Sequence, residues 1–224
     1  MYLAEKILCF YRRLRSPSRL PAGVKVMNPY RHQKTLRLCG SFYRHYFNDD
    51  NPRTLLLGIN PGRFGAGLTG ICFTDPIKLE NDCGIANDLE KKPELSADFI
   101  YRMIHAYGGP DPFYRRFLIS AVSPLGFTKK GLNMNYYDDP GLQKAVTPFI
   151  VDCIRKQVDF GIRTDVCFCI GRGANQKFLE SLNTRYGFFR RIVPLPHPRW
   201  IMQYRRKHLS QYIDQYVRTL NQTQ

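Results

Sequence analysis

Four short and almost uninterrupted apolar runs, separated by segments of helical periodicity, limit most strongly how this chain can fold. The runs lie at residues 54–59, 117–122, 165–171 and 191–196. Continuous apolar runs of this length are typical of strands that are covered on both faces, as in parallel sheets. Because Pro194 cannot donate a hydrogen bond to a neighbouring strand, we expect the fourth run to lie at an edge of the sheet.

Helical patterns fill the segments between these runs. They cover residues 34–47, 96–108, 141–161, 174–187 and about 205–220. Strands that alternate with helices predict an α/β fold, a three-layer sandwich in which a central, mainly parallel four-stranded sheet is flanked by helices. We expect a single domain over residues 1–224, with an N-terminal helical extension over about residues 1–50. Ligands bind such folds beyond the carboxyl ends of the strands, so the loops after the first, second and fourth runs should meet on one rim.

The chain carries a large excess of positive charge. It contains 34 Lys and Arg against 18 Asp and Glu, a formal net charge of +16. A small domain needs a net charge of only about 2–8 for solubility, so the excess indicates a polyanionic partner, most commonly nucleic acid. A generally basic surface without a specific partner is the alternative. An anionic membrane surface fits less well, because no helical segment is strongly amphipathic with a wholly apolar face.

Cysteine usage and hydropathy indicate an intracellular protein. No apolar run approaches the length of a membrane span, and the N-terminus does not read as a secretory signal. The seven cysteines are an odd number without framework spacing, as expected of reduced thiols. Cys167 and Cys169 fall in the third apolar run, where core thiols are favoured over a metal site. We therefore expect a cytoplasmic protein.

A glycine-rich segment, LGINPGRFGAGLTGICF, spans the end of the first predicted strand and the loop after it, at residues 57–73. It contains G-x-G-x-x-G at residues 65–70 and, at residues 62–69, a phosphate-binding loop with Leu68 in place of the lysine. A dinucleotide site needs its first glycine directly after the strand and a helix that begins within the motif, and neither condition holds. A triphosphate site needs the missing lysine. The segment is better explained as a sharp bend that brings backbone, and Asn60 at the strand end, close to a ligand.

The same segment resembles the first motif of the uracil-DNA glycosylase superfamily. It is most similar to the single-strand-selective monofunctional subfamily, whose motif reads G-M-N-P-G-x-F-G-x-x-x-T-G-x-x-F. The matching positions are Gly58, Asn60, Pro61, Gly62, Phe64, Gly65, Thr69, Gly70 and Phe73. The family's second motif appears as LPHPRW with His197, and SAVSPL resembles its segment H-N-x-C-P-L. The resemblance spans about residues 54–200, and the extended GICFTDPIKLENDCGI indicates a bacterial side branch.

The resemblance implies cleavage of the bond between C1′ of deoxyribose and a damaged base. It implies that Asn60 positions the attacking water and that His197 donates a hydrogen bond to the base carbonyl beside the breaking bond. From the residues alone, Asn60 could instead form a turn before Pro61, and His197 could be structural. Asp75, the only carboxylate close to the loop, is favoured as a cap before Pro76 over a second water-positioning group.

The resemblance also implies how the base is held. Phe73 would stack on the flipped base, although a lone Phe is more often a core residue. Backbone amides from Gly62 to Gly65 would hold base carbonyls, and Phe64 would shape the pocket.

This chain departs from the family at the residue that reads the base edge. The family asparagine aligns with Ala121, which is flanked by Ser120 and Ser123. Asn133 and Asn135 are candidate replacements, although each is better explained as a loop residue. A pocket with fewer fixed polar groups could admit other deaminated bases, such as xanthine or hypoxanthine, besides uracil.

The segment HPRWIMQYRRK resembles, in shortened form, the family wedge that fills the gap left by a flipped base. Four of its residues combine a charge with apolar bulk: Arg199, Trp200, Ile201 and Met202. Three basic residues could then contact phosphates: Arg205, Arg206 and Lys207. Packing of Trp200 under the C-terminal helix is an equal alternative.

The leading prediction is a monofunctional DNA glycosylase that removes uracil, or another deaminated base, from single- or double-stranded DNA and so initiates base excision repair. We expect such an enzyme to act as a monomer and to need no metal or organic cofactor. No lysine lies in the motifs to form a Schiff base, so strand cleavage is not expected. Two alternatives stay open: a basic α/β domain of the same fold that binds nucleic acid without cutting it, and a hydrolase of another nucleoside-like substrate.

Overall fold

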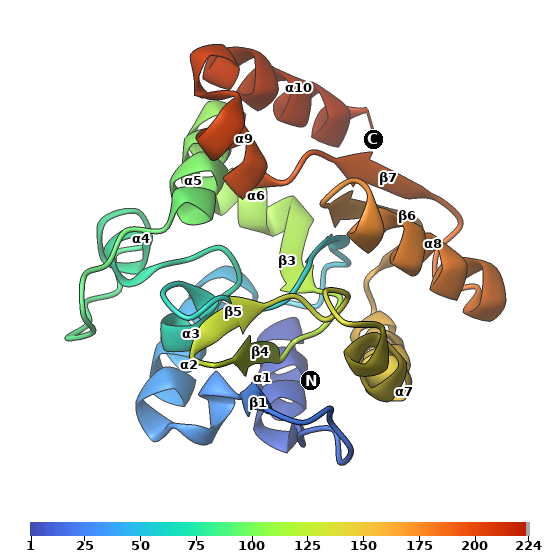
Figure 1. The fold of residues 1–224 in the computed structure, drawn as a ribbon. Helices are drawn as coiled ribbons and strands as arrows, with labels where there is room; N and C mark the ends of the chain where they lie inside the picture. Colours follow the sequence, from blue (N-terminus) through green and yellow to red (C-terminus); the bar gives the residue numbers. More distant parts are fainter. Residues whose placement is uncertain (223–224) are drawn as a thin grey trace.

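The computed structural model describes residues 1–222 and has a four-stranded parallel sheet at its centre (Figure 1). Its strands are β2 (Thr54–Gly58), β3 (Phe117–Ala121), β6 (Arg163–Ile170) and β7 (Ile192–Leu195). They lie in the order β3-β2-β6-β7, and each adjacent pair is parallel. The predicted α/β fold with its central parallel sheet is confirmed.

The four strands correspond to the four apolar runs of the sequence. All five residues of the inner strand β2 are buried, because strands lie on both of its sides and helices cover the sheet. Pro194 lies in β7, which pairs only with β6, so the proline occupies an edge strand as predicted. Since all four strands are parallel, their carboxyl ends share one rim of the sheet.

Helices flank this sheet on both sides. The longer ones are α1 (Leu3–Arg13), α2 (Gln33–Tyr46), α5 (Leu95–Tyr107), α7 (Pro140–Val158), α8 (Ala174–Tyr186) and α10 (Leu209–Asn221). The shorter ones are η1 (Pro29–Arg31), α3 (Ala66–Thr69), α4 (Pro76–Asn81), α6 (Pro110–Arg116), α9 (Pro198–Tyr204) and η2 (Arg206–His208). In Figure 1, α1, α2 and α7 lie below the sheet and α5, α9 and α10 lie above it.

The five predicted helices correspond to α2, α5, α7, α8 and α10. The last of them begins at Leu209 rather than near residue 205, because the 3-10 turn η2 precedes it. Asp139 caps α7 by accepting a hydrogen bond from the Leu142 amide at 3.0 Å. Helix α8 ends at Gly187, which has a φ of 64°.

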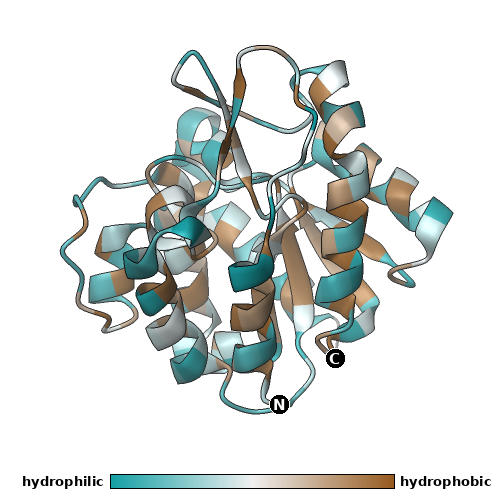
Figure 2. Cartoon of the chain, turned by 90° about the horizontal axis from the view of Figure 1, so that it is seen from below, coloured by the Kyte–Doolittle hydropathy of each residue, from teal (hydrophilic) through white to brown (hydrophobic). Residues whose placement is uncertain are grey.

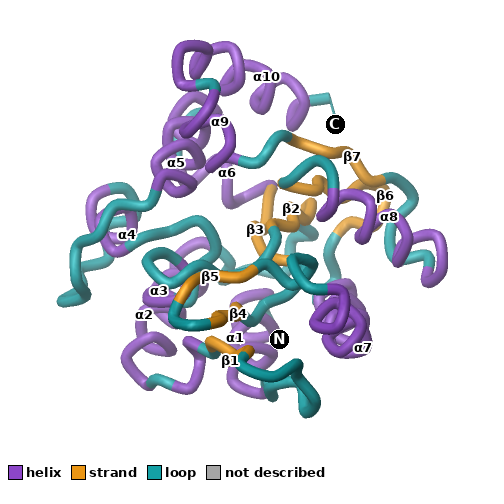
Figure 3. The backbone as a smooth tube through the Cα atoms, viewed as in Figure 1, coloured by secondary structure: helices purple, strands orange, loops and turns teal. Residues whose placement is uncertain are grey.

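A second, three-stranded antiparallel sheet was not predicted from the sequence. It has the order β1-β4-β5 and consists of β1 (Val24–Met27), β4 (Gly126–Lys129) and β5 (Leu132–Met134). Figure 3 shows these three strands separate from the main sheet. The first 50 residues therefore supply a strand as well as helices. Lys130 and Gly131 both have positive φ, the geometry of a tight two-residue hairpin turn between β4 and β5.

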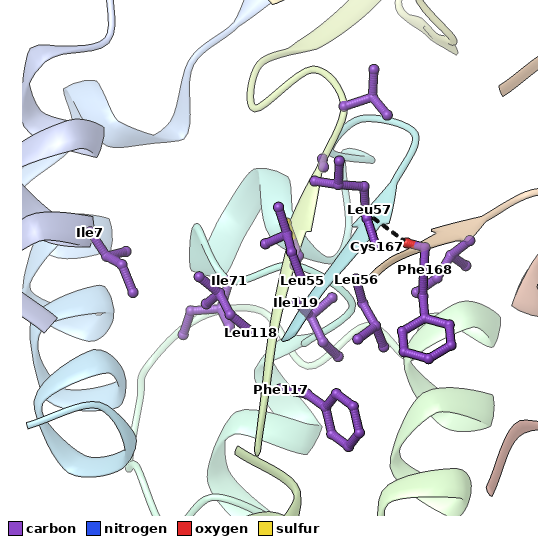
Figure 4. Packing of buried hydrophobic residues seen from close by; sticks show 14 of the residues in the cluster. Ile7, Leu55, Leu56, Leu57, Ile71, Phe117, Leu118, Ile119, Cys167 and Phe168 are labelled. Carbon is purple, nitrogen blue, oxygen red and sulfur yellow. Dashed lines mark hydrogen bonds between the residues drawn. The ribbon is translucent and has the colours of Figure 1, made fainter. Parts of the chain in front are cut away.

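Apolar side chains of the main sheet form the core. Leu55, Leu56 and Leu57 pack beside Ile119 of β3 and Phe168 of β6, all buried (Figure 4). Figure 2 shows the strands mostly hydrophobic and the outer helices mixed, as burial of one helix face requires. Cys167 and Cys169 are buried core thiols. Within residues 1–222, no helix is long and apolar enough to cross a membrane.

Candidate active site

The loops at the carboxyl ends of the four central strands line one pocket of about 300 Å³. The structure brings Asn60 and His197 into this pocket together, although they are far apart in the sequence. Other predicted site residues that line it are Gly62, Phe73, Ser120, Asn133, Arg199 and Trp200. Ala121 and Asn135, which were weighed as base-reading positions, line it too. A cavity of this size at a strand-end rim can hold one flat heterocycle.

The Asn60 side chain is fixed by backbone groups of the β5 segment. Its Oδ1 accepts a hydrogen bond from the Tyr136 amide at 3.0 Å. Its Nδ2 donates to the Met134 carbonyl at 3.3 Å and to the Pro61 carbonyl at 3.4 Å. Both amide hydrogens are thereby occupied, and one lone pair of Oδ1 stays free. The free lone pair of Oδ1 can accept a hydrogen bond from a water molecule in the pocket.

His197 begins helix α9 and has a defined proton position. Its Nδ1 accepts a hydrogen bond from the Arg199 amide at 3.1 Å, so the neutral ring carries its proton on Nε2. Burial, with a smaller contribution from the positive charge of Arg199, lowers the pKa of His197 to about 4. At neutral pH the side chain therefore presents an uncharged N–H donor to the pocket.

Phe73 supplies an aromatic face next to His197. The two ring centroids are 5.9 Å apart, with 50° between the planes. Phe73 has a φ of 53°, an unusual conformation for a bulky residue. A Cβ atom on Gly58 would lie 2.7 Å from Cε2 of the Phe73 ring. The close approach of this ring to the end of β2 therefore requires glycine at position 58.

The Thr69 hydroxyl holds the bend of the first motif together. It accepts a hydrogen bond from the Ile71 amide at 3.1 Å and donates one to the Thr74 carbonyl at 2.6 Å. Within the motif, α3 is only four residues long and ends at Gly70. This short helix differs from the extended helix that a dinucleotide or triphosphate site needs.

The two serines beside Ala121 have different surroundings. Ser120 lines the pocket and donates a hydrogen bond to the buried Gln157 side chain. Ser123 is fully buried, donates to the Leu125 carbonyl at 2.8 Å and does not line the pocket. Ala121 brings no polar side chain to the position of the family asparagine.

The hairpin residues Asn133 and Asn135 reach the pocket from the second sheet. Asn133 is exposed, and its Oδ1 accepts a hydrogen bond from the Arg63 amide at 3.2 Å. Asn135 is tied to Asp138, to which its Nδ2 donates at 3.2 Å. The Asn133 Nδ2 is therefore the more available donor, because the Asn135 amide is already engaged.

Phe64 lies outside the pocket, on the surface. Its side chain is 41% exposed. Two cations lie over the ring: the Arg63 guanidinium at 5.0 Å from the ring centroid and the Lys92 ammonium at 5.2 Å. The structure therefore places Phe64 among cations near the first motif, and not on the pocket wall as expected. Gly65 does not line the pocket either.

Helix α9 divides the residues of the predicted wedge between surface and core. Ile201 and Met202 are buried, because this side of the helix packs against α5, so they are not free to enter DNA. Trp200 is 39% exposed, with its ring edge-on to Tyr212. Tyr204, which the sequence analysis did not single out, is 66% exposed and lines the pocket.

Basic residues continue from α9 along the surface. Arg205, Arg206 and Lys207 are exposed and line a second hollow beside the pocket, together with Gln203 and Tyr204. The Arg205 guanidinium lies 5.0 Å from the centroid of the Trp200 ring. This basic surface adjoins the pocket, because Gln203 and Tyr204 line both hollows.

Asp75 is a structural residue. It is buried, and one carboxylate oxygen accepts a hydrogen bond from the Lys78 amide at 2.8 Å, which caps helix α4. The other oxygen accepts from the Glu94 amide at 2.9 Å. Asp75 does not line the pocket.

Glu94 is a pocket residue that the sequence analysis missed. Its carboxyl group lies against the glycine loop, with Oε2 only 1.9 Å from where a Cβ atom on Gly65 would be. Burial and, to a smaller extent, the nearby Asp75 charge raise the pKa of Glu94 to about 7, although Arg199 opposes the shift. No local pattern marks this residue, because a single glutamate before a helix usually lies on the surface.

Comparisons with known proteins agree with this geometry. The chain matches the family model described as Uracil DNA glycosylase superfamily over residues 44–221. It is similar to the crystal structure of wild-type Pedobacter heparinus SMUG2, with 47% sequence identity and a TM-score of 0.97. That similarity covers 100% of this chain and 98% of the other. No match was found among curated proteins.

Proposed function

This chain belongs to the uracil DNA glycosylase superfamily, and we propose that it is a monofunctional glycosylase that hydrolyses the N-glycosidic bond of uracil in DNA. The observation that carries the proposal is the pairing of a fixed amide, Asn60, with a neutral histidine donor, His197, in one pocket sized for a single base. The product would be an abasic site, and the reaction would be the first step of base excision repair.

Asn60 positions the attacking water in this proposal. Its Oδ1 keeps one free lone pair while the Tyr136 amide occupies the other. An amide orients water without removing its proton, which suits a reaction in which the bond to the base breaks largely before water attacks. The developing sugar cation then needs only a nearby oxygen in the correct place.

His197 stabilises the departing base. Because its Nδ1 accepts a hydrogen bond from the Arg199 amide, its Nε2–H can donate a hydrogen bond to the base carbonyl beside the breaking bond. Negative charge moves onto that carbonyl as the bond breaks, and a buried donor aimed at developing charge contributes roughly 3 kcal/mol. The lowered pKa of His197 keeps the ring uncharged over the physiological range, so its donor role does not depend on pH there.

Phe73, together with Ala121 in place of the family asparagine, determines which bases the pocket accepts. The Phe73 ring offers a face for stacking, which does not discriminate strongly between bases. Ala121 leaves the base edge without a side-chain amide, and the Nδ2 of Asn133 is the available donor in its place. We therefore include the deaminated purines xanthine and hypoxanthine in the proposed substrate class.

The DNA would be held by the surface beside α9. Trp200 and Tyr204 would fill the gap left by the flipped nucleotide, and Arg205, Arg206 and Lys207 would contact phosphates. Within residues 1–222, no lysine lines the pocket. Strand cleavage through a Schiff base is therefore not part of the proposal.

A base-release assay tests the proposal. The protein is incubated with end-labelled single- and double-stranded DNA that contains one uracil, and abasic sites are then cleaved with alkali. We expect a product band at the uracil position only. The alternative is a binding domain that keeps the fold but has lost activity at Ala121, and it predicts salt-dependent DNA binding without product.

A further inference from the structure

Glu94 is the only carboxylate among residues 1–222 that lines the pocket. Its Oε1 lies 3.4 Å from where a Cβ atom on Gly62 would be, and its Oε2 lies still closer to the corresponding position on Gly65. The two glycines leave the space that the carboxyl group fills. The Glu94 amide is anchored on Asp75, but no group in the described chain donates a hydrogen bond to either carboxyl oxygen.

Two charged groups act on Glu94: the Asp75 carboxylate, which caps α4, and the Arg199 guanidinium on α9. The Cys72 thiol also lines the pocket, and burial raises the pKa of Cys72 to about 12, so it stays uncharged. Burial is the main reason why the pKa of Glu94 is raised to about 7. Near neutral pH, a substantial fraction of the molecules therefore carries a proton on this carboxyl group.

Glu94 and His197 reach the pocket from different elements of the fold. The glycine loop under Glu94 follows β2, whereas His197 follows β7, and strand β6 lies between these two strands. Adjacent strands are about 4.8 Å apart, so the ends of β2 and β7, two spacings apart, are separated by roughly 10 Å, which leaves room for a base between the glycine loop and His197. A base whose glycosidic nitrogen is flanked by His197 on one side turns its opposite edge toward Glu94.

That opposite edge differs between pyrimidines and purines. In uracil, with O2 toward His197, it carries C5–H, which accepts no hydrogen bond. In a purine, with the N3 side toward His197, it carries N7, whose lone pair is an acceptor. A carboxylic acid at this place therefore has a partner in a purine and none in uracil.

We propose that Glu94 in its acid form donates its proton to N7 of a flipped deaminated purine, and so extends the pocket from uracil to xanthine or hypoxanthine. The inference rests on the proposed glycosylase function. As the bond from C1′ to N9 breaks, its electron pair passes to the purine, and the Glu94 proton moves to N7. Water held by Asn60 bonds to C1′ and releases a proton to solvent. The base leaves neutral, and the Glu94 carboxylate is reprotonated from solvent.

The test compares Glu94→Gln with the wild type in single-turnover release of xanthine, hypoxanthine and uracil from matched oligonucleotides between pH 6 and pH 9. Glutamine keeps the shape and a donor, but it neither transfers a proton nor titrates. At pH 6 we expect the variant to lose at least ~10-fold more rate on a purine than on uracil, since general acid catalysis contributes at least about 100-fold. The variant-to-wild-type ratio on the purine should then rise by at least ~10-fold toward pH 9, because the wild type loses its acid. Any effect of pH on the base itself cancels in this ratio, because the variant and the wild type act on the same substrate.

A matched control is Glu90→Gln, which changes an exposed carboxylate in the same loop and should leave all three rates unchanged. If Glu94→Gln does not fold, Glu94→Asp withdraws the acid from N7 by one methylene and should lower the purine rate more than the uracil rate. Equal losses on purine and uracil, a flat ratio across pH, or a wild type that releases uracil but neither purine would overturn the inference. A wild type that releases no base at all would instead contradict the proposed function.

Discussion

The Oδ1 atom of Asn60 accepts a hydrogen bond from the backbone amide of Tyr136 at 3.0 Å, although the two residues are 76 positions apart in the sequence. The first motif is therefore held in place by the segment that follows the small second sheet. Because Met134 accepts a hydrogen bond from the same carboxamide, the side chain has one orientation with a lone pair left for water. The second sheet thus supports the chemistry of the main one.

Gly58→Ala should disturb the Phe73 ring, which we propose stacks on the flipped base. The added methyl group would meet Phe73 at 2.7 Å, so the ring or the strand end has to move. We expect a loss of about 1–3 kcal/mol in the free energy of unfolding, as for other overpacked sites, and at least ~10-fold slower uracil release. Urea unfolding and single-turnover assays measure the two effects. Gly40→Ala, which meets only a flexible arginine tip, is the control and should be neutral or slightly stabilising.

Trp200→Ala should affect mainly activity on duplex DNA, whereas Ile201→Ala should affect mainly the free energy of unfolding. Trp200 is partly exposed beside the pocket, so its loss should weaken uracil release from duplex DNA more than from single strands. Ile201 is fully buried, so its truncation should lower the free energy of unfolding by about 2–5 kcal/mol. The idea that α9 presents Trp200 to DNA fails if both variants behave alike in both assays.

Replacement of Arg205, Arg206 and Lys207 by glutamine should weaken DNA binding without regard to sequence. Each phosphate contact contributes about 0.9 to the slope of log affinity against log salt for duplex DNA, so the slope should fall by up to about 3. Fluorescence anisotropy over a salt series measures this slope. An unchanged slope would place the phosphate contacts elsewhere on the basic surface.

The wild type should show a stability contribution from Glu94 that disappears as the pH rises. The folded pKa of Glu94, about 7, is above the ordinary 4.5, so between these values the folded state keeps a proton that the unfolded chain has released. The contribution is complete below pH 4.5 and is lost as pH rises through 7. Relative to the wild type, Glu94→Gln should gain about 3 kcal/mol in free energy of unfolding between pH 4.5 and pH 8.

The titration of His197 changes the free energy of unfolding in the opposite sense, over an overlapping range of pH. Its folded pKa of about 4 lies below the ordinary 6.5, so the unfolded chain binds a proton first and the stability rises with pH between these values. The two contributions oppose each other in the wild type. The comparison must therefore be made as the difference between Glu94→Gln and the wild type in urea unfolding at each pH, and a difference that does not vary with pH would contradict the raised pKa.

The fold was predictable because its strands are covered on both faces. Residues such as Leu55 to Leu57 read as continuous apolar runs, and the edge position of Pro194 follows from its missing amide hydrogen. The second sheet was not predictable in this way. Its strands are only three or four residues long and partly exposed, so the run around Leu132 has no apolar period.

The site was predictable where it depends on local sequence and not where it depends on packing. Asn60, Phe73 and His197 lie in motifs, and the structure places them in one pocket. Glu94 reaches that pocket only because α5 begins next to the glycine loop, a tertiary relationship without a sequence period. Ile201, proposed as part of the wedge from its apolar character, faces the core because of how α9 is turned.

The most direct test of the account is single-turnover release of uracil by the wild type, Asn60→Ala and His197→Ala, with DNA binding measured in parallel. The wild type should release uracil, and each substitution should lower the rate by roughly 100-fold or more while the affinity for DNA stays within about threefold, since each removes a group that acts on the transition state. Release at the wild-type rate by either variant would contradict the proposal that these two side chains act together on one flipped base.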